Sequence, residues 1–233
     1  TASLIAQVEG RLDGLDLALQ KSERFVFIVY DELDTLYYTD WSRMLQVLRG
    51  LTAMWAGYYR RWKRLRPKLF VRTDLFDEQY GLMTSDAAKM AARRVELHWS
   101  DRDLYGALFK QIIHRDKKLM EYFRPKLSLH DDNAFGQTPA FESAKSIDPA
   151  VARLCGEFMG ANANKGHTRT WLLNAIRDGA GRASPRNLIQ LIEKAGSIEH
   201  RQMRSVHRAA QLLHHVSLRN ALTEVSRDHV RDA

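Results

Sequence analysis

The hydrophobic pattern of the first hundred residues alternates between helix-like and strand-like segments. Residues 3–21 carry leucine and valine at spacings of three and four, which predicts a helix with one apolar face. An unbroken apolar and aromatic run follows at residues 25–30 and predicts a fully buried strand. Residues 41–65 again repeat apolar positions in steps of three and four, which predicts a long helix that Pro67 ends. This helix either packs on a sheet or forms a coiled coil.

A second strand-like run, Leu69–Val71, follows this helix and leads directly into Arg72-Thr73-Asp74. Its distance from the first strand leaves room for one crossover helix, so we expect a β-α-β unit with parallel strands. Residues 93–99 predict a further short strand. Ser100 then caps a new helix, with Asp103 at the matching position of a capping box.

The remainder of the chain is predicted to be mostly helical, so the fold class is α/β with domains at residues 1–99 and 100–233. Residues 124–147 are rich in polar residues, proline and glycine, and predict a long loop. The expected helices begin at Asp101, at Asp148-Pro149, at Thr168 and after Ser184-Pro185, and further helices span residues 197–215 and 218–230. His200, His207 and His214 recur every seven residues, which does not match helical metal-ligand spacing and favours a polar stripe.

Composition limits where in the cell we expect the protein to be. Cys155 is the single cysteine, so the chain has no internal disulfide framework; we expect a small core residue and a reducing, cytoplasmic location. No apolar run approaches the roughly 20 residues of a membrane span, and no signal peptide is visible. The chain opens directly in a helical pattern and ends without a C-cap glycine or other stop signal, so we expect both ends to be cuts in a longer protein.

Candidate chemistry lies where the two predicted strands end. Asp31 and Glu32 follow the first strand, and parallel strands bind ligands at their carboxyl ends. Carboxylate oxygens suit Mg²⁺, and the planar fork of Arg72 suits phosphate oxygens. The alternatives are an ordinary strand that ends in an acidic turn, and an arginine paired with Asp74 or Asp77.

The segment FVFIVYDELDTL, residues 25–36, resembles the Walker B strand of P-loop ATPases of the additional-strand catalytic-glutamate class. The resemblance implies that Asp31 holds the Mg²⁺ of ATP, directly or through water, and that Glu32 polarises the attacking water. The segment around Arg72 and Thr73 is similar to the sensor-1 strand of the signal-transducing (STAND) members, in which the arginine reaches the γ-phosphate.

Two later segments extend the resemblance over about residues 1–196. Trp99-Ser100 is similar to the start of the helical lid, and Ser184-Pro185-Arg186 resembles the sensor-2 helix of AAA+ ATPases, whose arginine reaches the phosphates. The family implies the second half of a parallel-sheet P-loop core followed by a helical lid. It also implies ATP and Mg²⁺ as ligands, and hydrolysis coupled to oligomerisation or effector control in bacterial signalling or antiviral defence. Arg93 and Arg94 are weaker candidates for an arginine finger.

The sequence contains no G-x-x-x-x-G-K-[ST] phosphate-binding loop. Residues 160–168, GANANKGHT, place lysine before glycine and predict a turn between helices. We therefore expect the nucleotide-cradling half to precede residue 1. The 233 residues alone are expected neither to bind ATP tightly nor to hydrolyse it.

A rival interpretation rests on charge. The net charge is +8, and aromatic residues interleave with basic ones in residues 58–68. Phosphate contacts with base stacking would use such a segment, which otherwise forms a solvated helix end. The alternative function is therefore a nucleic-acid-binding or scaffolding module with a degenerate ATPase fold. Its candidate contact residues are Arg60, Arg61, Lys63 and Arg64.

Overall fold

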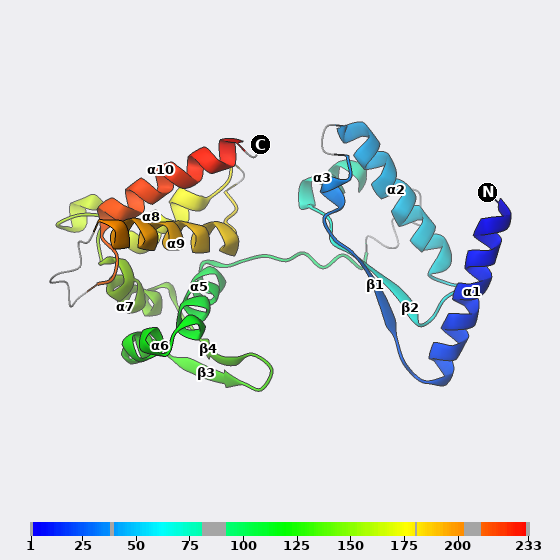
Figure 1. Ribbon diagram of the computed structural model, residues 1–233, viewed down its shortest axis with the longest axis horizontal. Coiled ribbons are helices and arrows are strands. Elements are labelled where there is room, and N and C mark those ends of the chain that lie inside the picture. The colour runs from blue at the N-terminus through cyan, green and yellow to red at the C-terminus, as the bar shows by residue number, and fades with distance from the viewer. Residues whose placement is uncertain (1, 38–39, 81–91, 180, 203–210, 232–233) are drawn as a thin grey trace. The chain divides into compact units, whose positions relative to one another are not determined.

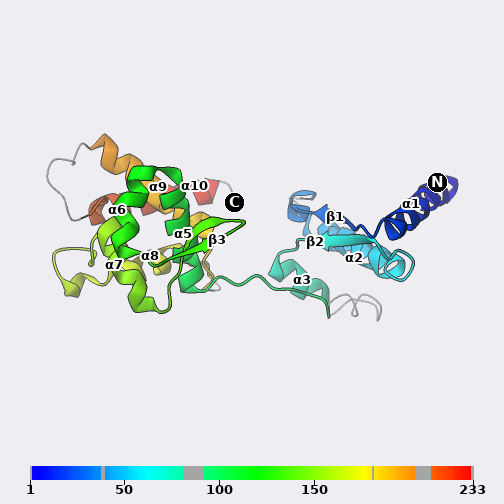
Figure 2. The same cartoon turned by 90° about the horizontal axis from the view of Figure 1, so that it is seen from below.

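The computed structural model describes residues 2–37, 40–80, 92–179, 181–202 and 211–231 (Figures 1 and 2). The chain is α/β and divides into two compact units, residues 1–97 and 98–233. Residues 203–210 of the helix predicted over 197–215, including His207, lie outside the described part.

The first unit is built around a parallel β-α-β unit, as the sequence predicts. Strands β1 and β2 pair in parallel, with Val26 opposite Leu65 and Tyr30 opposite Leu69, and α2 is the crossover helix. The elements of this unit are α1 (Ala2–Lys21), β1 (Val26–Tyr30), the 3-10 helix η1 (Leu33–Thr35), α2 (Trp41–Tyr58), β2 (Leu65–Leu69) and α3 (Thr73–Tyr80).

One face of the sheet packs against α1 and α2. Trp55 and Trp62 lie at the centre of this contact, and the indole Nε1 of Trp55 donates to the hydroxyl of Tyr30 at 3.2 Å. The prediction that the helix runs to residue 65 is wrong, because α2 ends at Tyr58. Trp62 and Leu65 are nevertheless buried, since the turn after α2 and the start of β2 return them to the same apolar cluster.

The opposite face of the sheet is open in the described structure. Phe27 and Val29 are more than half exposed, whereas Ile28 and Tyr30 alternate with them and pack against the helices. The prediction of a fully buried strand is therefore wrong for β1. An apolar run indicates burial but does not reveal how many faces of its sheet are covered.

Strand β2 also differs from its predicted bounds of Leu69–Val71, because it spans Leu65–Leu69 and contains Pro67. The amide of Val26 donates to Arg64 O and the amide of Phe70 to Tyr30 O. Because main-chain groups alternate in direction along a strand, the nitrogen of Pro67 points away from β1. The missing N–H therefore costs no hydrogen bond in this pair, which is the usual condition for proline in a sheet.

A buried carboxylate of α1 holds the turn between α2 and β2. Asp16 is 2% exposed and accepts hydrogen bonds from the amides of Lys63 (3.0 Å), Arg64 (2.7 Å) and Leu65 (2.9 Å). The side-chain amide of Gln20 donates to the same carboxylate at 2.7 Å. Burial alone would raise the pKa of Asp16, but these donors together lower it below its ordinary value.

Helix α1 ends in a Schellman motif with an unusual residue. The amide of Glu23 donates to Gln20 O and the amide of Arg24 to Leu19 O, while Glu23 has a left-handed φ of 55°. Glycine normally occupies this position because a Cβ is costly there. The motif turns the chain from α1 into β1.

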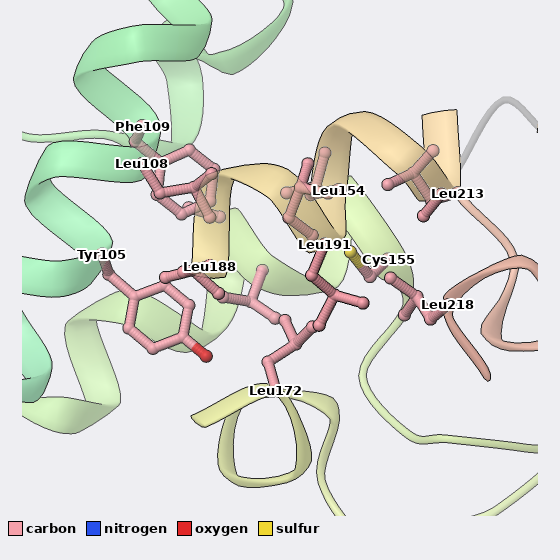
Figure 3. Close-up of a cluster of buried hydrophobic side chains, with 14 of the residues drawn as sticks. Tyr105, Leu108, Phe109, Leu154, Cys155, Leu172, Leu188, Leu191, Leu213 and Leu218 are labelled. Carbon is pink, nitrogen blue, oxygen red and sulfur yellow. The ribbon is translucent and has the colours of Figure 1, made fainter. Parts of the chain in front are cut away.

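The second unit is a helical assembly with a β-hairpin. Its elements are α5 (Asp101–Arg115), α6 (Lys117–Phe123), η2 (Arg124–Lys126), β3 (Leu129–Asp132), β4 (Gly136–Pro139), α7 (Ala144–Cys155), η3 (Ala163–Lys165), α8 (Thr168–Ile176), α9 (Pro185–Arg201) and α10 (His215–Arg231). Side chains from α5, α7, α8, α9 and α10 converge in one core (Figure 3). Cys155 lies in it at 1% exposure, as predicted.

Local capping signals are confirmed in this unit. Ser100 and Asp103 form the expected capping box, and Ser184 caps α9 with Pro185 in its first turn. The described residues of the segment 160–168 form the expected connection between two helices, α7 and α8.

Four predictions fail in or beside the second unit. Residues 93–99 form no strand, and Val95 and Leu97 are exposed. The loop predicted at 124–147 contains η2, the antiparallel hairpin β3–β4 and the start of α7. Helix α7 begins at Ala144, capped by Ser143, instead of at Asp148. Helix α9 ends at Arg201, and residues 211–214 are not helical.

We expect Asp16→Ala to destabilise the first unit by about 3 kcal/mol, because three main-chain donors lose their acceptor in a largely buried place. Because the pKa of Asp16 is lowered on folding, its stabilisation is complete above the unfolded pKa of about 3.9 and is lost as pH falls through the folded pKa. Urea unfolding followed by tryptophan fluorescence should therefore show the advantage of wild type over Asp16→Ala at pH 7 and its decline below about pH 4. Glu23→Gln is the control and should show no such difference.

Replacing Glu23 by glycine should stabilise the protein by about 1 kcal/mol, because glycine adopts the left-handed conformation without the Cβ penalty. Glu23→Ala keeps the Cβ and should bring no comparable gain. Thermal unfolding of both variants measures the difference. Equal midpoints for the glycine and alanine variants would contradict the described end of α1.

Candidate functional site

The predicted catalytic carboxylates lie at the carboxyl end of β1. Asp31 and Glu32 directly follow the strand and are both exposed. The amide of Glu32 donates to Asp31 Oδ1 at 2.8 Å, and Thr35 Oγ1 donates to Glu32 O at 2.8 Å. Leu33 is buried against α2 and α3, so the acidic turn is anchored by one apolar residue in its middle.

Glu32 adopts a left-handed conformation, with φ 54° and ψ 31°. For a residue with a Cβ this costs about 1–2 kcal/mol. Glu23 has nearly the same φ, but there it closes a helix with two main-chain hydrogen bonds. Glu32 instead sets the direction of the chain at the strand tip, and strained residues of this kind cluster at functional sites.

Arg72 connects the tips of the two strands. Its Nε and Nη2 atoms donate to the carboxylate of Asp74 at 3.2 and 2.7 Å, and its Nη1 lies 3.7 Å from Asp34 Oδ2 in η1. The hydrogen bonds from Arg72 lower the pKa of Asp74 below its ordinary value. The pairing with Asp74 is the structural alternative anticipated from sequence, whereas Asp77 pairs with Arg94 at 2.8 Å.

The other phosphate-sensing candidates lie on two different helices. Thr73 is the first residue of α3, directly after Arg72. Arg186 lies in the first turn of α9 in the second unit and is exposed. Its role as a sensor-2 residue stays a prediction. Of the finger candidates, Arg93 lies over the ring of Tyr59 at 4.2 Å.

Acidic residues of α1 engage the basic and aromatic segment, residues 58–68. Arg61 pairs with Glu9 at 2.8 Å and with Asp13 at 2.6 Å, and the indole of Trp62 donates to Asp13. Tyr58 donates to Glu9. The expected helix end is wrong here, because this segment is a turn followed by β2.

The four nucleic-acid candidates consequently differ in their surroundings. Arg61 is engaged by α1, and Arg64 lies over the ring of Phe25 at 4.6 Å. Arg60 and Lys63 are exposed, and the described residues offer them no charged partner. Most of the excess positive charge lies in the second unit. Residues 1–97 hold 15 Lys/Arg and 13 Asp/Glu, whereas residues 98–233 hold 21 Lys/Arg and 15 Asp/Glu.

Sequence reasoning missed the acidic residues of α1. Glu9, Asp13 and Asp16 recur at spacings of four and three, which places them on one face of the helix. That spacing was visible in the sequence. Their partners lie 47 to 52 residues further along the chain, so no local sequence pattern predicts these contacts.

Within the described residues, no group of three or more histidine, cysteine or acidic side chains is arranged to hold a metal ion. A Mg²⁺ site does not require such a group, because Mg²⁺ commonly takes one or two carboxylates together with water and substrate phosphates. Asp31 and Glu32 have the chemistry for that kind of site. Among the same residues, no helix is both long and apolar enough to cross a membrane.

Comparison of this chain with protein families, curated proteins and solved structures finds no match in any of the three.

The ion pairs of Arg72 should contribute little to stability, because more than half of this side chain is exposed and such pairs are worth less than about 1 kcal/mol. We expect Arg72→Ala to change the free energy of unfolding by less than about 1 kcal/mol. Urea unfolding at low and high salt provides the measurement. A loss of several kcal/mol would identify Arg72 as a structural residue of the tip.

Proposed function

We propose that this chain supplies the Walker B, sensor-1 and sensor-2 parts of a P-loop ATPase. The observation that carries the proposal is the parallel pairing of β1 and β2. It brings Asp31-Glu32 and Arg72-Thr73 to the same end of one sheet, which is the end at which parallel sheets bind ligands. The contact of Arg72 with η1 supports this placement.

The proposed roles follow from the chemistry of each side chain. Asp31 would hold Mg²⁺ on ATP, and Glu32 would orient and polarise the water that attacks the γ-phosphate. Arg72 would contact the phosphate oxygens, with Thr73 beside it, and its long 3.7 Å contact with Asp34 is weak enough to be exchanged. Arg186 would contact a phosphate, because an exposed arginine in the first turn of α9 suits an anion.

The biological role that we propose is regulatory. ATP binding and hydrolysis would control assembly of further copies of the protein or the activity of an effector protein, as in bacterial antiviral defence. A phosphate-binding loop is absent from the 233 residues, so the proposal requires that another segment supply it.

The full-length protein should hydrolyse ATP, and Glu32→Gln should bind ATP but lose turnover by at least about a hundredfold, the lower range for loss of a general base. Glu23→Gln is a closely matched control, because it changes the other glutamate with a left-handed backbone. It should retain activity. Steady-state phosphate release and binding of a fluorescent ATP analogue measure the two effects.

Two outcomes would contradict the ATPase proposal. Equal loss of activity in Glu32→Gln and Glu23→Gln would indicate a folding effect instead of a catalytic one. If neither wild type nor variant binds ATP, the acidic tip is structural. The rival nucleic-acid or scaffolding function would then be preferred, and the excess positive charge of residues 98–233 indicates where to look for its contacts.

The isolated 233-residue chain is expected to show no ATP turnover. Hydrolysis by this chain that Asp31→Ala abolishes would show that it contains a complete site, against the proposal.

A further inference from the structure

The open face of the β1–β2 sheet carries a row of exposed apolar side chains. Phe25, Phe27 and Val29 are 51%, 53% and 58% exposed, and Phe70, just beyond β2, is 50% exposed. The rings of Phe25 and Phe27 stack with their centroids 6.3 Å apart. Given the usual area of these side chains, the row presents roughly 400 Å² of apolar surface. Patches of this size on folded proteins are often interaction sites.

The pairing of the strands makes this exposure informative. Parallel sheets occur almost only where both faces are covered, and an isolated pair of strands is rarely stable without packing on its faces. Here, Trp55 and Trp62 contribute to the cover over one face. The described residues leave the other face uncovered, so this row has the character of an interface.

Two cations of the open face lie over phenylalanine rings. The guanidinium of Arg64 lies 4.6 Å from the ring centre of Phe25, and the ammonium of Lys68 lies 5.2 Å from that of Phe27. Neither has a carboxylate partner among the residues that the structure describes. An occupant that buries the phenylalanines must also satisfy these charges.

On the covered face of the sheet, one helix both buries apolar side chains and pairs with basic residues. Helix α1 packs Leu12 and Leu19 into the tryptophan cluster and presents Glu9 and Asp13 to Arg61. An apolar stripe flanked by carboxylates is thus the helix surface that fits the basic segment leading into β2. The open face repeats the combination of apolar rings and basic residues, but the described residues give these cations no carboxylate partner.

We propose that the open face of β1–β2 binds an amphipathic helix of a partner protein, with an apolar stripe over Phe25, Phe27 and Val29 and acidic residues toward Arg64 and Lys68. A helix is the element that normally covers the face of a parallel sheet. The proposal uses none of the residues at the strand tips, but the helices of a P-loop core cover both faces of its sheet, so the segment that the ATPase function requires competes for this face. Loss of acidic-peptide binding in a protein that carries that segment would overturn the proposal.

The probe is a synthetic amphipathic peptide of about 20 residues, long enough for stable helical turns, with one leucine stripe flanked by glutamates. A second peptide has the same stripe flanked by lysines. Fluorescence anisotropy of the labelled peptides with the 233-residue chain should show at least about tenfold tighter binding of the acidic peptide. Hydrogen exchange should show protection of β1 and β2 by the acidic peptide alone.

Substitutions separate the apolar part of the interface from the charged part. Phe27→Ser should weaken binding of the acidic peptide by at least about tenfold, because it removes the central ring. Lys68→Glu should reduce or reverse the preference for the acidic peptide. Lys68 is exposed, so this variant keeps the fold and tests the proposal even if Phe27→Ser unfolds. Circular dichroism and tryptophan fluorescence monitor folding of both.

Phe135 provides a matched control. It is 66% exposed in the β3–β4 turn, and the ammonium of Lys110 lies 4.8 Å from its ring centre, so its local chemistry resembles that of Phe27. Phe135→Ser should leave peptide binding unchanged. Equal weakening by Phe135→Ser, or equal affinity for the acidic and basic peptides, would overturn the proposal.

A second copy of the chain is the competing occupant. If the molar mass in sedimentation equilibrium rises with concentration and Phe27→Ser prevents the rise, the open face is a self-association surface. That result would overturn the assignment of an acidic partner helix. A constant monomer mass together with charge-selective peptide binding would support it.

Discussion

The carboxylate of Asp16 determines where the chain enters β2. It accepts hydrogen bonds from three consecutive main-chain amides, so residues 63–65 have little freedom in how they approach the sheet. The register of β2 against β1 begins at this point, and the position of Arg72 at the far end of the strand follows from that register. A charged group in a buried place thus serves the backbone, and main-chain donors offset the cost of removing it from water.

The strand tips are constructed differently from this buried contact. Leu33 anchors the acidic turn in the small cluster around α2, while the nearby ion pairs of Arg72 with Asp34 and Asp74 are partly exposed to solvent. Exposed pairs can exchange partners at small cost. The backbone of the tip is therefore fixed by an apolar anchor and by the left-handed turn at Glu32, while the ionic contacts above it remain exchangeable. A site that must accept and release a charged ligand benefits from that division.

Sequence patterns predicted local features such as helix caps well, but they did not predict which face of the sheet is covered by helices. Ser100 and Ser184 were correctly identified as helix caps because a cap depends on residues only three positions away. The step of three and four residues from Trp41 continued through Trp62 and Leu65, although the helix ends at Tyr58, because a turn and a strand return these side chains to the same cluster. The apolar run of β1 correctly predicted a strand but did not show which face would be covered. The contact between Asp16 and residues 63–65 joins segments that are distant in sequence, and no short-range signal encodes it.

Pro67 restricts how the sheet of the first unit can be extended. Every second residue of β2 directs its main-chain amide away from β1, toward the free edge of the sheet. The first of these amides, that of Leu65, already donates to Asp16. The next position on that edge is Pro67, which has no N–H. The first donor that a neighbouring strand could use is therefore the amide of Leu69, at the end of β2 that leads to Arg72. A strand added to this edge would find its first main-chain donor at the carboxyl end of β2, whereas the beginning of β2 offers it only carbonyl oxygens.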